Sequence, residues 1–235
     1  MIRKICANLF DILFPPQCVS CASSVQRDEI LCPMCVSTLS LRSGFLCSVC
    51  GRRLPELKVT CHKNAFPIAA ATDYRSKAVH ELVRALKYRH IVSVGDLIAS
   101  LIKTFAEKNM TDISFDNCVI VPIPSSSNRE RTRGYNQAEY IARLFIKKIG
   151  TSAPLLTRAL LKKRDSLSQV TCADYKEREK NVLGSFCVRD AETILGKTVI
   201  IFDDVSTSGA TMREAARELR RAGAKHIVGF VFAKA

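Results

Sequence analysis

The residues with the clearest chemical potential lie in one run from Lys197 to Thr211, which reads KTVIIFDDVSTSGAT. Four apolar residues suggest a strand buried on both faces, and two carboxylates follow where that strand is expected to emerge. A hydroxyl-rich turn comes next, and a helix-period segment starts beside it and ends at Gly223. Free N–H groups and the helix dipole would make this turn an anion cradle. The candidate binding residues are Asp203, Asp204, Ser206, Thr207, Ser208, Gly209, Ala210 and Thr211.

The two carboxylates cannot hold the same phosphate that the turn would hold. Asp203 and Asp204 suit sugar hydroxyls instead, or a metal ion bridged by water. The run lacks the Gly-Lys-Ser/Thr of a Walker loop and the spaced glycines of a dinucleotide turn. The alternative is an ordinary strand, turn and helix with an acidic turn.

A second polar loop follows another buried strand, Asn117 to Pro124, which ends in two prolines. The loop runs from Ser125 to Gln137 and leads into a helix that continues to Ile149 and is capped by Gly150. A strand that ends in a basic loop at a helix start is again an anion site, because guanidinium forks match phosphate oxygens. For the arginines, a solvated turn is the alternative. The candidates here are Ser125, Ser126, Arg131 and Arg133.

Cysteine spacing indicates a metal module. Seven of the eleven cysteines lie between residues 18 and 61, as three Cys-x-x-Cys pairs and a single Cys61. Two such pairs supply the four sulfurs that structural zinc prefers, so the first two pairs predict one zinc site. The third pair and Cys61 allow two interpretations. They could bind a second zinc with His62 or water as fourth ligand, or they could form a degenerate knuckle that packing and hydrogen bonds hold together. The ligand candidates are Cys18, Cys21, Cys32, Cys35, Cys47, Cys50 and Cys61.

Both helices and strands are expected to position these residues. Helical spacing of apolar residues predicts helices over Lys77 to Tyr88 and Val94 to Lys108. A polar stretch after Lys163 suggests a flap from Arg164 to Gln169. The remaining expectations are strands at Ile68 to Tyr74, Leu155 to Leu161, Phe186 to Val188 and His226 to Phe232, and a charged helix at Asp174 to Val182. The expected parts are a packing helix at 1–16, a cysteine-rich zinc-ribbon module at 17–64 and an α/β domain at 65–235.

The 235 residues are nearly half apolar and carry a formal net charge of +14. Such a charge predicts an anionic partner but does not choose among small phosphates, nucleic acid and phospholipid. No run approaches the roughly 20 apolar residues of a membrane span, and no cleavage site follows the apolar N-terminus. A cytoplasmic protein is therefore expected, with cysteines that act as metal ligands or thiols.

The run around Asp203 and Asp204 resembles the phosphoribosyl-pyrophosphate (PRPP) signature of type I phosphoribosyltransferases. The resemblance implies a parallel sheet flanked by helices, acids on the ribose hydroxyls, a loop on the 5′-phosphate, and Mg²⁺ with PRPP. The loop after the Val121-Pro-Ile-Pro124 strand would then receive the pyrophosphate, and Lys87 is a weaker phosphate contact. Asp203, Asp204 and Arg133 are the expected catalytic residues.

The whole chain is similar to the ComF family of competence-associated proteins. The likeness rests on the cysteine pairs, Leu86-Lys87-Tyr88, the Val-Pro-Ile-Pro strand, Arg133-Gly-Tyr-Asn-Gln137 and the acidic run, and continues at Gln169, Arg178 and Asn181. It implies a role in DNA uptake. The chain departs from the family at the second metal site, because its fourth cysteine pair is incomplete.

Two functions stay open at this point. One is an enzyme that transfers the phosphoribosyl group of PRPP to an acceptor that no residue identifies. The other is a non-catalytic module that binds single-stranded DNA or a helicase-like uptake partner through its basic surface, with strong salt dependence. The basic residues available are Arg129, Arg131, Lys162, Lys163, Arg164, Lys176, Arg178, Lys180, Arg217, Arg220 and Arg221.

Overall fold

The computed structural model describes residues 15–57, 60–88, 92–111, 113–163 and 182–235. Three expected segments lie mostly or wholly outside these residues. They are the packing helix at 1–16, of which only the last two residues are described, the flap at 164–169 and the charged helix at 174–182, of which only the last residue is described. Gln169, Lys176, Arg178, Lys180 and Asn181 also lie outside the described residues. In chain order the elements are α2 (Pro33–Ser37), β1 (Phe45–Cys47), β2 (Arg53–Leu54), β3 (Pro67–Asp73), α3 (Lys77–Tyr88), α4 (Val92–Asn109), η1 (Phe115–Asn117), β4 (Cys118–Pro122), α5 (Ser127–Arg133), α6 (Gln137–Ile149), β5 (Leu160–Lys162), β6 (Phe186–Val188), η2 (Ala191–Thr193), β7 (Thr198–Ser206), α8 (Ala210–Arg221) and β8 (His226–Lys234).

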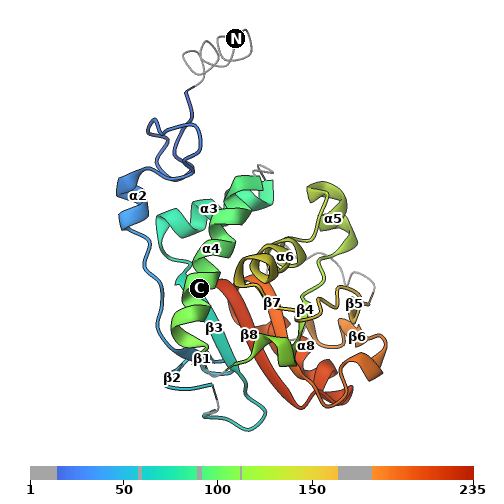
Figure 1. Cartoon of the computed structure of the whole chain (residues 1–235). Helices are drawn as coiled ribbons and strands as arrows, with labels where there is room; N and C mark the ends of the chain where they lie inside the picture. Colours follow the sequence, from blue (N-terminus) through green and yellow to red (C-terminus); the bar gives the residue numbers. More distant parts are fainter. Residues whose placement is uncertain (1–14, 58–59, 89–91, 112, 164–181) are drawn as a thin grey trace.

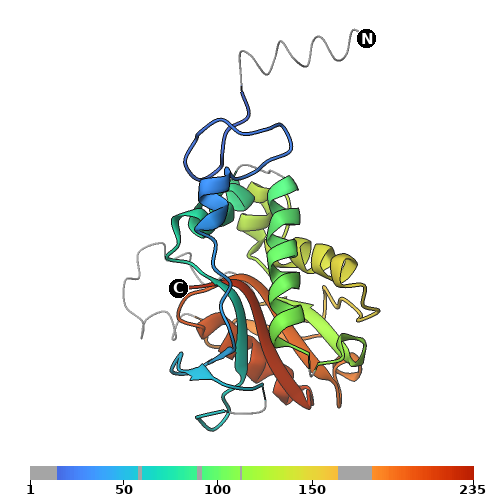
Figure 2. The ribbon, with the colours of Figure 1, turned by 60° about the vertical axis from the view of Figure 1, so that its left-hand side comes forward.

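A six-stranded sheet forms the centre of the molecule, in the order β2-β1-β3-β8-β7-β4 (Figure 1). Strands β3, β8, β7 and β4 pair in parallel, and β1 adds to β3 in the antiparallel sense. Helices α3, α4 and α6 cover one face, while α8 covers the other (Figure 2). The expected α/β class, a largely parallel sheet flanked by helices, is therefore confirmed.

Strand β7 shows why both faces of the sheet are buried. Ile200 and Phe202 pack with the helices α3, α4 and α6, whereas Val199 and Ile201 pack under α8. Successive side chains of a strand point to opposite faces, so a continuous apolar run is what a sheet between two helical layers needs. Phe202 also contacts the rings of Phe145 and Phe230, with centroids 5.8 and 5.4 Å away.

Three expected boundaries are wrong. Strand β7 does not stop at the acidic pair but continues to Ser206, because β8 extends in register beside it as far as Lys234. The polar loop after β4 contains the helix α5. The expected strand from Leu155 to Leu161 is broken by a turn, and β5 covers only its last two residues and Lys162.

The sheet also crosses the expected domain boundary at residue 65. Cys47, the first ligand candidate of the third cysteine pair, ends β1 and lies opposite Pro67 of β3. The first two cysteine pairs lie instead around α2, where Cys32 is the N-cap and Cys35 is part of the helix. The second half of the cysteine-rich module is therefore part of the central sheet, whereas the first half is not.

Candidate functional site

The acidic pair lies near the carboxyl end of β7, in the region where open α/β sheets bind ligands. Asp204 is buried, and its Oδ2 atom lies 2.9 Å from the Nζ atom of Lys87 at the end of α3. Asp203 is partly buried beside it and accepts a hydrogen bond from the backbone N–H of Asp204. Burial and the neighbouring carboxylate raise the pKa of Asp203 well above its ordinary range.

The turn between β7 and α8 is short, since it holds only Thr207, Ser208 and Gly209. Gly209 caps α8 with a φ of +75°, a conformation that glycine adopts without strain. The hydroxyl of Ser208 accepts a hydrogen bond from the N–H of Ala210. Ser206 is buried, and its hydroxyl has no hydrogen-bond partner within the described part of the chain.

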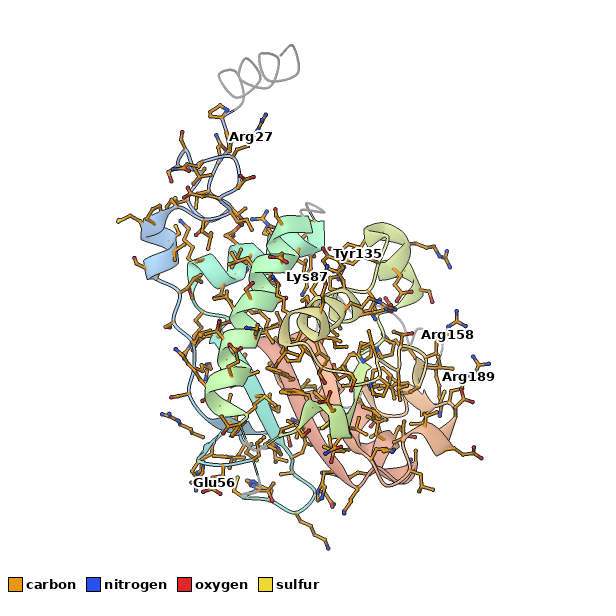
Figure 3. The ribbon with its side chains drawn as sticks, in the orientation of Figure 1. Arg27, Glu56, Lys87, Tyr135, Arg158 and Arg189 are labelled. Atoms are coloured by element: carbon orange, nitrogen blue, oxygen red, sulfur yellow. The ribbon has the colours of Figure 1, made fainter. Side chains whose placement is uncertain are left out.

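The basic side of the site comes from α5 and the start of α6. The hydroxyl of Ser125 donates to Glu130, so α5 folds back over the end of β4. Arg133 donates to the side chain of Gln137, and its guanidinium lies 5.4 Å from the ring centroid of Tyr88. The Tyr135 hydroxyl donates to the carbonyl of Leu86, the residue before Lys87 (Figure 3).

These groups line one open cavity of about 390 Å³. Seven of the predicted residues border it: Lys87, Ser125, Ser126, Arg133, Asp203, Asp204 and Thr211. The cavity is not bordered by Arg131 on α5, nor by five predicted residues in or beside the turn: Ser206, Thr207, Ser208, Gly209 and Ala210. Sequence reasoning did not assign Tyr88, Asn136, Gln137, Lys162 and Phe186, which also border it. Tyr88, Asn136 and Gln137 belong to sequence motifs that the chain shares with the ComF family, and these motifs could have identified them as site residues.

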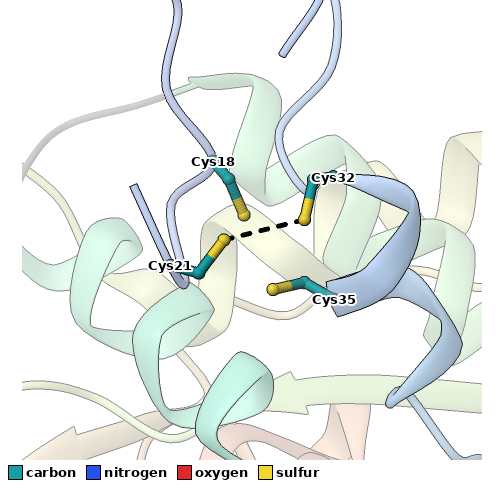
Figure 4. Close-up of side chains that lie close together, drawn as sticks. All are labelled: Cys18, Cys21, Cys32 and Cys35. Carbon is teal, nitrogen blue, oxygen red and sulfur yellow. Dashed lines mark hydrogen bonds between the residues drawn. The ribbon is translucent and has the colours of Figure 1, made fainter. Parts of the chain in front are cut away.

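The first cysteine cluster is built for a metal ion. The Sγ atoms of Cys18, Cys21, Cys32 and Cys35 all lie within 4.8 Å of one another, and those of Cys21 and Cys32 are 3.6 Å apart (Figure 4). Sulfurs at about 2.3 Å from a tetrahedral zinc ion stand about 3.8 Å apart, so the observed spacing fits zinc.

The second cluster offers four potential ligands. His62 joins Cys47, Cys50 and Cys61, with its Nδ1 atom 3.2 Å from the sulfur of Cys61 and 3.7 Å from that of Cys47. Burial disfavours the Cys47 thiolate, but N–H groups of residues 49 and 50 outweigh it and lower the pKa of this thiol to about 6. All four donor atoms lie within 4.8 Å of one another, so this set also fits zinc.

We expect purified protein to contain two zinc ions per chain. The double variant Cys50→Ser and Cys61→Ser should lose about one ion and retain the other, because the first cluster shares no ligand with the second. Metal analysis after gel filtration measures both numbers. A wild-type content of one ion, unchanged in the variant, would contradict a metal at the second cluster.

Part of the basic surface proposed for DNA is engaged within the protein. Arg217 forms ion pairs with Glu214 and Glu218, and Arg221 pairs with Glu218. Arg220 donates to the backbone carbonyls of residues 64 and 65. These three arginines on α8 therefore contribute less free charge than the sequence suggests.

The fold and the cavity define a class of protein. The chain belongs to the phosphoribosyl transferase domain family, which matches residues 91–234, and the double zinc ribbon domain family matches residues 9–64. With this pair of domains and the relatives described next, the chain is a member of the ComF family.

Three relatives show how far the similarity extends. The competence protein ComFC of Bacillus subtilis (strain 168) is 27% identical over 85% of this chain and 81% of its own length. The DNA utilization protein YhgH of Salmonella typhi is 25% identical over 88% and 85%, respectively. ComFC of Streptococcus pneumoniae is 26% identical over 86% and 87%.

A solved structure of the allosteric regulatory enzyme of purine biosynthesis aligns with 59% of this chain and 26% of its own, at 22% identity and a TM-score of 0.37. Among the described residues, none of the helices combines the length and the apolar character needed to span a bilayer.

Proposed function

We propose that the cavity binds PRPP together with Mg²⁺ and supports transfer of its phosphoribosyl group. The observation that carries the proposal is the meeting of three chemistries at one cavity: two carboxylates, a helix N-terminus with its hydroxyl, and a basic helix. A sugar that bears a 5′-phosphate and a pyrophosphate needs all three. The match of the phosphoribosyl transferase domain family to residues 91–234 supports the same assignment.

In this proposal the carboxylates of Asp203 and Asp204 accept hydrogen bonds from the ribose hydroxyls. The N–H groups of the turn and the hydroxyl of Thr211 at the start of α8 hold the 5′-phosphate. Arg133 and the hydroxyls of Ser125 and Ser126 face the pyrophosphate, for which a guanidinium is well suited. The acids, Thr211 and the basic side border the cavity, and the turn joins β7 to Thr211 next to it.

Transfer breaks the bond between the ribose C1 atom and the pyrophosphate oxygen and forms a bond from C1 to the acceptor. Negative charge grows on the departing pyrophosphate, and preorganised donors such as Arg133 stabilise it. Mg²⁺ supplies further charge neutralisation when bound, and carboxylate oxygens are ligands that it accepts. The chain's own part is to orient the ribose and to hold the leaving group.

Lys87 has a defined part in this proposal. Its ion pair with Asp204 neutralises one acid while the cavity is empty. Ribose hydroxyls would replace the ammonium of Lys87 at the carboxylate, and Lys87 would turn to a phosphate oxygen. The same ammonium would then pair with Asp204 in the empty site and with the ligand in the filled site. The relatives' names, competence protein and DNA utilization protein, suggest that this activity serves DNA uptake.

Isothermal titration calorimetry with PRPP and Mg²⁺ tests the proposal. We expect saturable binding, weaker binding of ribose 5-phosphate and weaker binding of pyrophosphate, because each carries only part of the recognised groups. Release of pyrophosphate on incubation with candidate acceptors then tests transfer. Lack of PRPP binding at millimolar concentration would rule the proposal out.

A further inference from the structure

Arg213 on α8 connects the phosphate-binding turn to the second cysteine cluster. Its Nη1 atom donates at 2.8 Å to the carbonyl of Ser208 in the turn, and at 2.8 Å to the carbonyl of Ser48. Ser48 lies between Cys47 and Cys50, inside the third cysteine pair. One guanidinium nitrogen therefore joins the turn to a residue 165 positions before Arg213 in the sequence.

The contact at Ser208 controls how the turn presents its N–H groups. In a trans peptide the C=O and the next N–H point in opposite directions. A cation that holds the carbonyl of Ser208 therefore turns the N–H of Gly209 to the other side. Lys234 holds the carbonyl of Thr207 in the same way and orients the next peptide. Carbonyls held by cations cannot rotate toward a bound phosphate, which they would repel.

The other end of the bridge is fixed by the cysteine cluster. Ser48 is buried, its N–H donates to the carbonyl of Phe66, and its hydroxyl accepts from the N–H of Phe66. The flanking residues Cys47 and Cys50 are both ligand candidates of the second cluster. A metal there would fix this peptide from both sides, and Arg213 would transmit its position to α8.

The turn packs closely against the third cysteine pair at Gly209. A Cβ atom on Gly209 would lie 3.1 Å from Nη1 of Arg213 and 3.3 Å from the carbonyl oxygen of Ser48. Further along α8, Arg220 donates to the carbonyls of Asn64 and Ala65. The helix that begins at the phosphate-binding turn is thus attached at two points to the segments that flank the cluster.

We propose that Arg213 is a positioning residue through which a metal at the second cysteine cluster sets the phosphate-binding turn. Metal bound by Cys47, Cys50, Cys61 and His62 would then raise the affinity for a ligand with a 5′-phosphate. The proposal rests on the proposed function for the identity of that ligand. It assigns the second cluster a role at the site, beyond support of the fold.

A double-mutant cycle tests the connection. Arg213→Gln and Cys61→Ser should each weaken PRPP binding about tenfold, as loss of a hydrogen bond to a charged group does. The double variant should bind no more weakly than either single variant, because both changes remove the same connection. Calorimetry gives the three dissociation constants, and metal analysis confirms that Arg213→Gln keeps both ions.

The first cluster provides the matched control. Cys21→Ser also removes an exposed cysteine ligand, but in the cluster at the far end of the module (Figure 2). Its PRPP affinity should stay at the wild-type value. Equal losses in Cys21→Ser and Cys61→Ser, fully additive losses in the cycle, or wild-type affinity in Arg213→Gln would each overturn the proposal. If Arg213→Gln does not fold, Arg213→Lys replaces it, since lysine keeps the charge but lacks the planar guanidinium that places Nη1 between the two carbonyls.

Hydrogen exchange separates this proposal from the proposed function. Without any ligand, Cys61→Ser should speed exchange of the amides from Ser208 to Thr211 several-fold, whereas Cys21→Ser should leave them unchanged. That result would stand even if PRPP did not bind. Binding of PRPP to the wild type with unchanged exchange and affinity in Cys61→Ser would instead overturn the coupling alone.

Discussion

Replacing Asp203 and Asp204 together by asparagine is expected to weaken PRPP binding by more than tenfold while pyrophosphate binding is kept or improves. Each carboxylate would lose a charge-assisted hydrogen bond to a ribose hydroxyl, worth about 1.5–3 kcal/mol. Pyrophosphate has no ribose, and removing two negative charges frees Lys87 from the ion pair that it forms with Asp204. The two ligands should therefore respond in opposite directions.

Calorimetry with both ligands measures this difference. Asp96→Asn is the control, because Asp96 is an exposed acid on α4 whose carboxylate pairs with Lys148 and does not border the cavity. Equal weakening of PRPP and pyrophosphate would mean that the acids act through the structure of the site and not through the ribose.

The single change Asp203→Asn should also stabilise the protein without ligand. The pKa of Asp203 is raised by burial and by the charge of Asp204, so its ionised form is disfavoured in the folded state. The folded protein loses stability as the pH rises from the ordinary carboxyl range through this raised pKa. Asparagine carries no charge, so the melting temperature of the Asp203→Asn variant should exceed that of the wild type at pH 7. The gap should close as the pH falls.

Periodicity was enough to predict the elements that carry the site. Helix α3 has the predicted limits, Lys77 and Tyr88, because its apolar residues fall on one face and that face is buried. Helix α6 ends before Gly150, whose φ of +75° supplies the left-handed cap. The order of buried strand, acidic pair and small turn likewise follows from local residue types. In each case the signal lies within a few neighbouring residues.

Contacts between distant segments could not be predicted in this way. The sequence left the fourth ligand of the second cluster open between His62 and water, because neighbouring side chains point in different directions. The segment turns, and Asn64 has a φ of +63°, so that His62 lies with the three cysteines. The length of β7 depends on the partner strand β8, which no local pattern encodes. The contacts of Arg213 join segments 165 residues apart, and the sequence around Arg213 reads only as one more basic helical turn.

The two cysteine clusters should differ most clearly in what their loss does to the fold. Between residues 15 and 37 the described chain buries only Cys18, Ser20, Leu31 and Cys32, while Met34 and Val36 are exposed. Leu31 is the one fully buried aliphatic side chain here, and Val19, Val25 and Ile30 are only partly buried. Because this is little core for such a segment, we infer that a metal supplies most of its order. Structural zinc contributes roughly 10–16 kcal/mol in small modules of this kind. The second cluster is different, because β1 pairs with β3 beside it.

We therefore expect the double variant Cys18→Ser and Cys32→Ser to unfold the segment from 15 to 37 and to leave the rest of the chain folded. Limited proteolysis with mass spectrometry should show rapid cleavage within that segment and a stable product that contains the sheet. Cys50→Ser with Cys61→Ser is the matched control, and its cleavage between 15 and 37 should stay slow. The cleaved product should also keep its affinity for PRPP, because the phosphate-binding turn is connected to the second cluster and not to the first. Slow cleavage of the segment in the first variant would show that packing against the neighbouring helices, and not a metal, holds it in place.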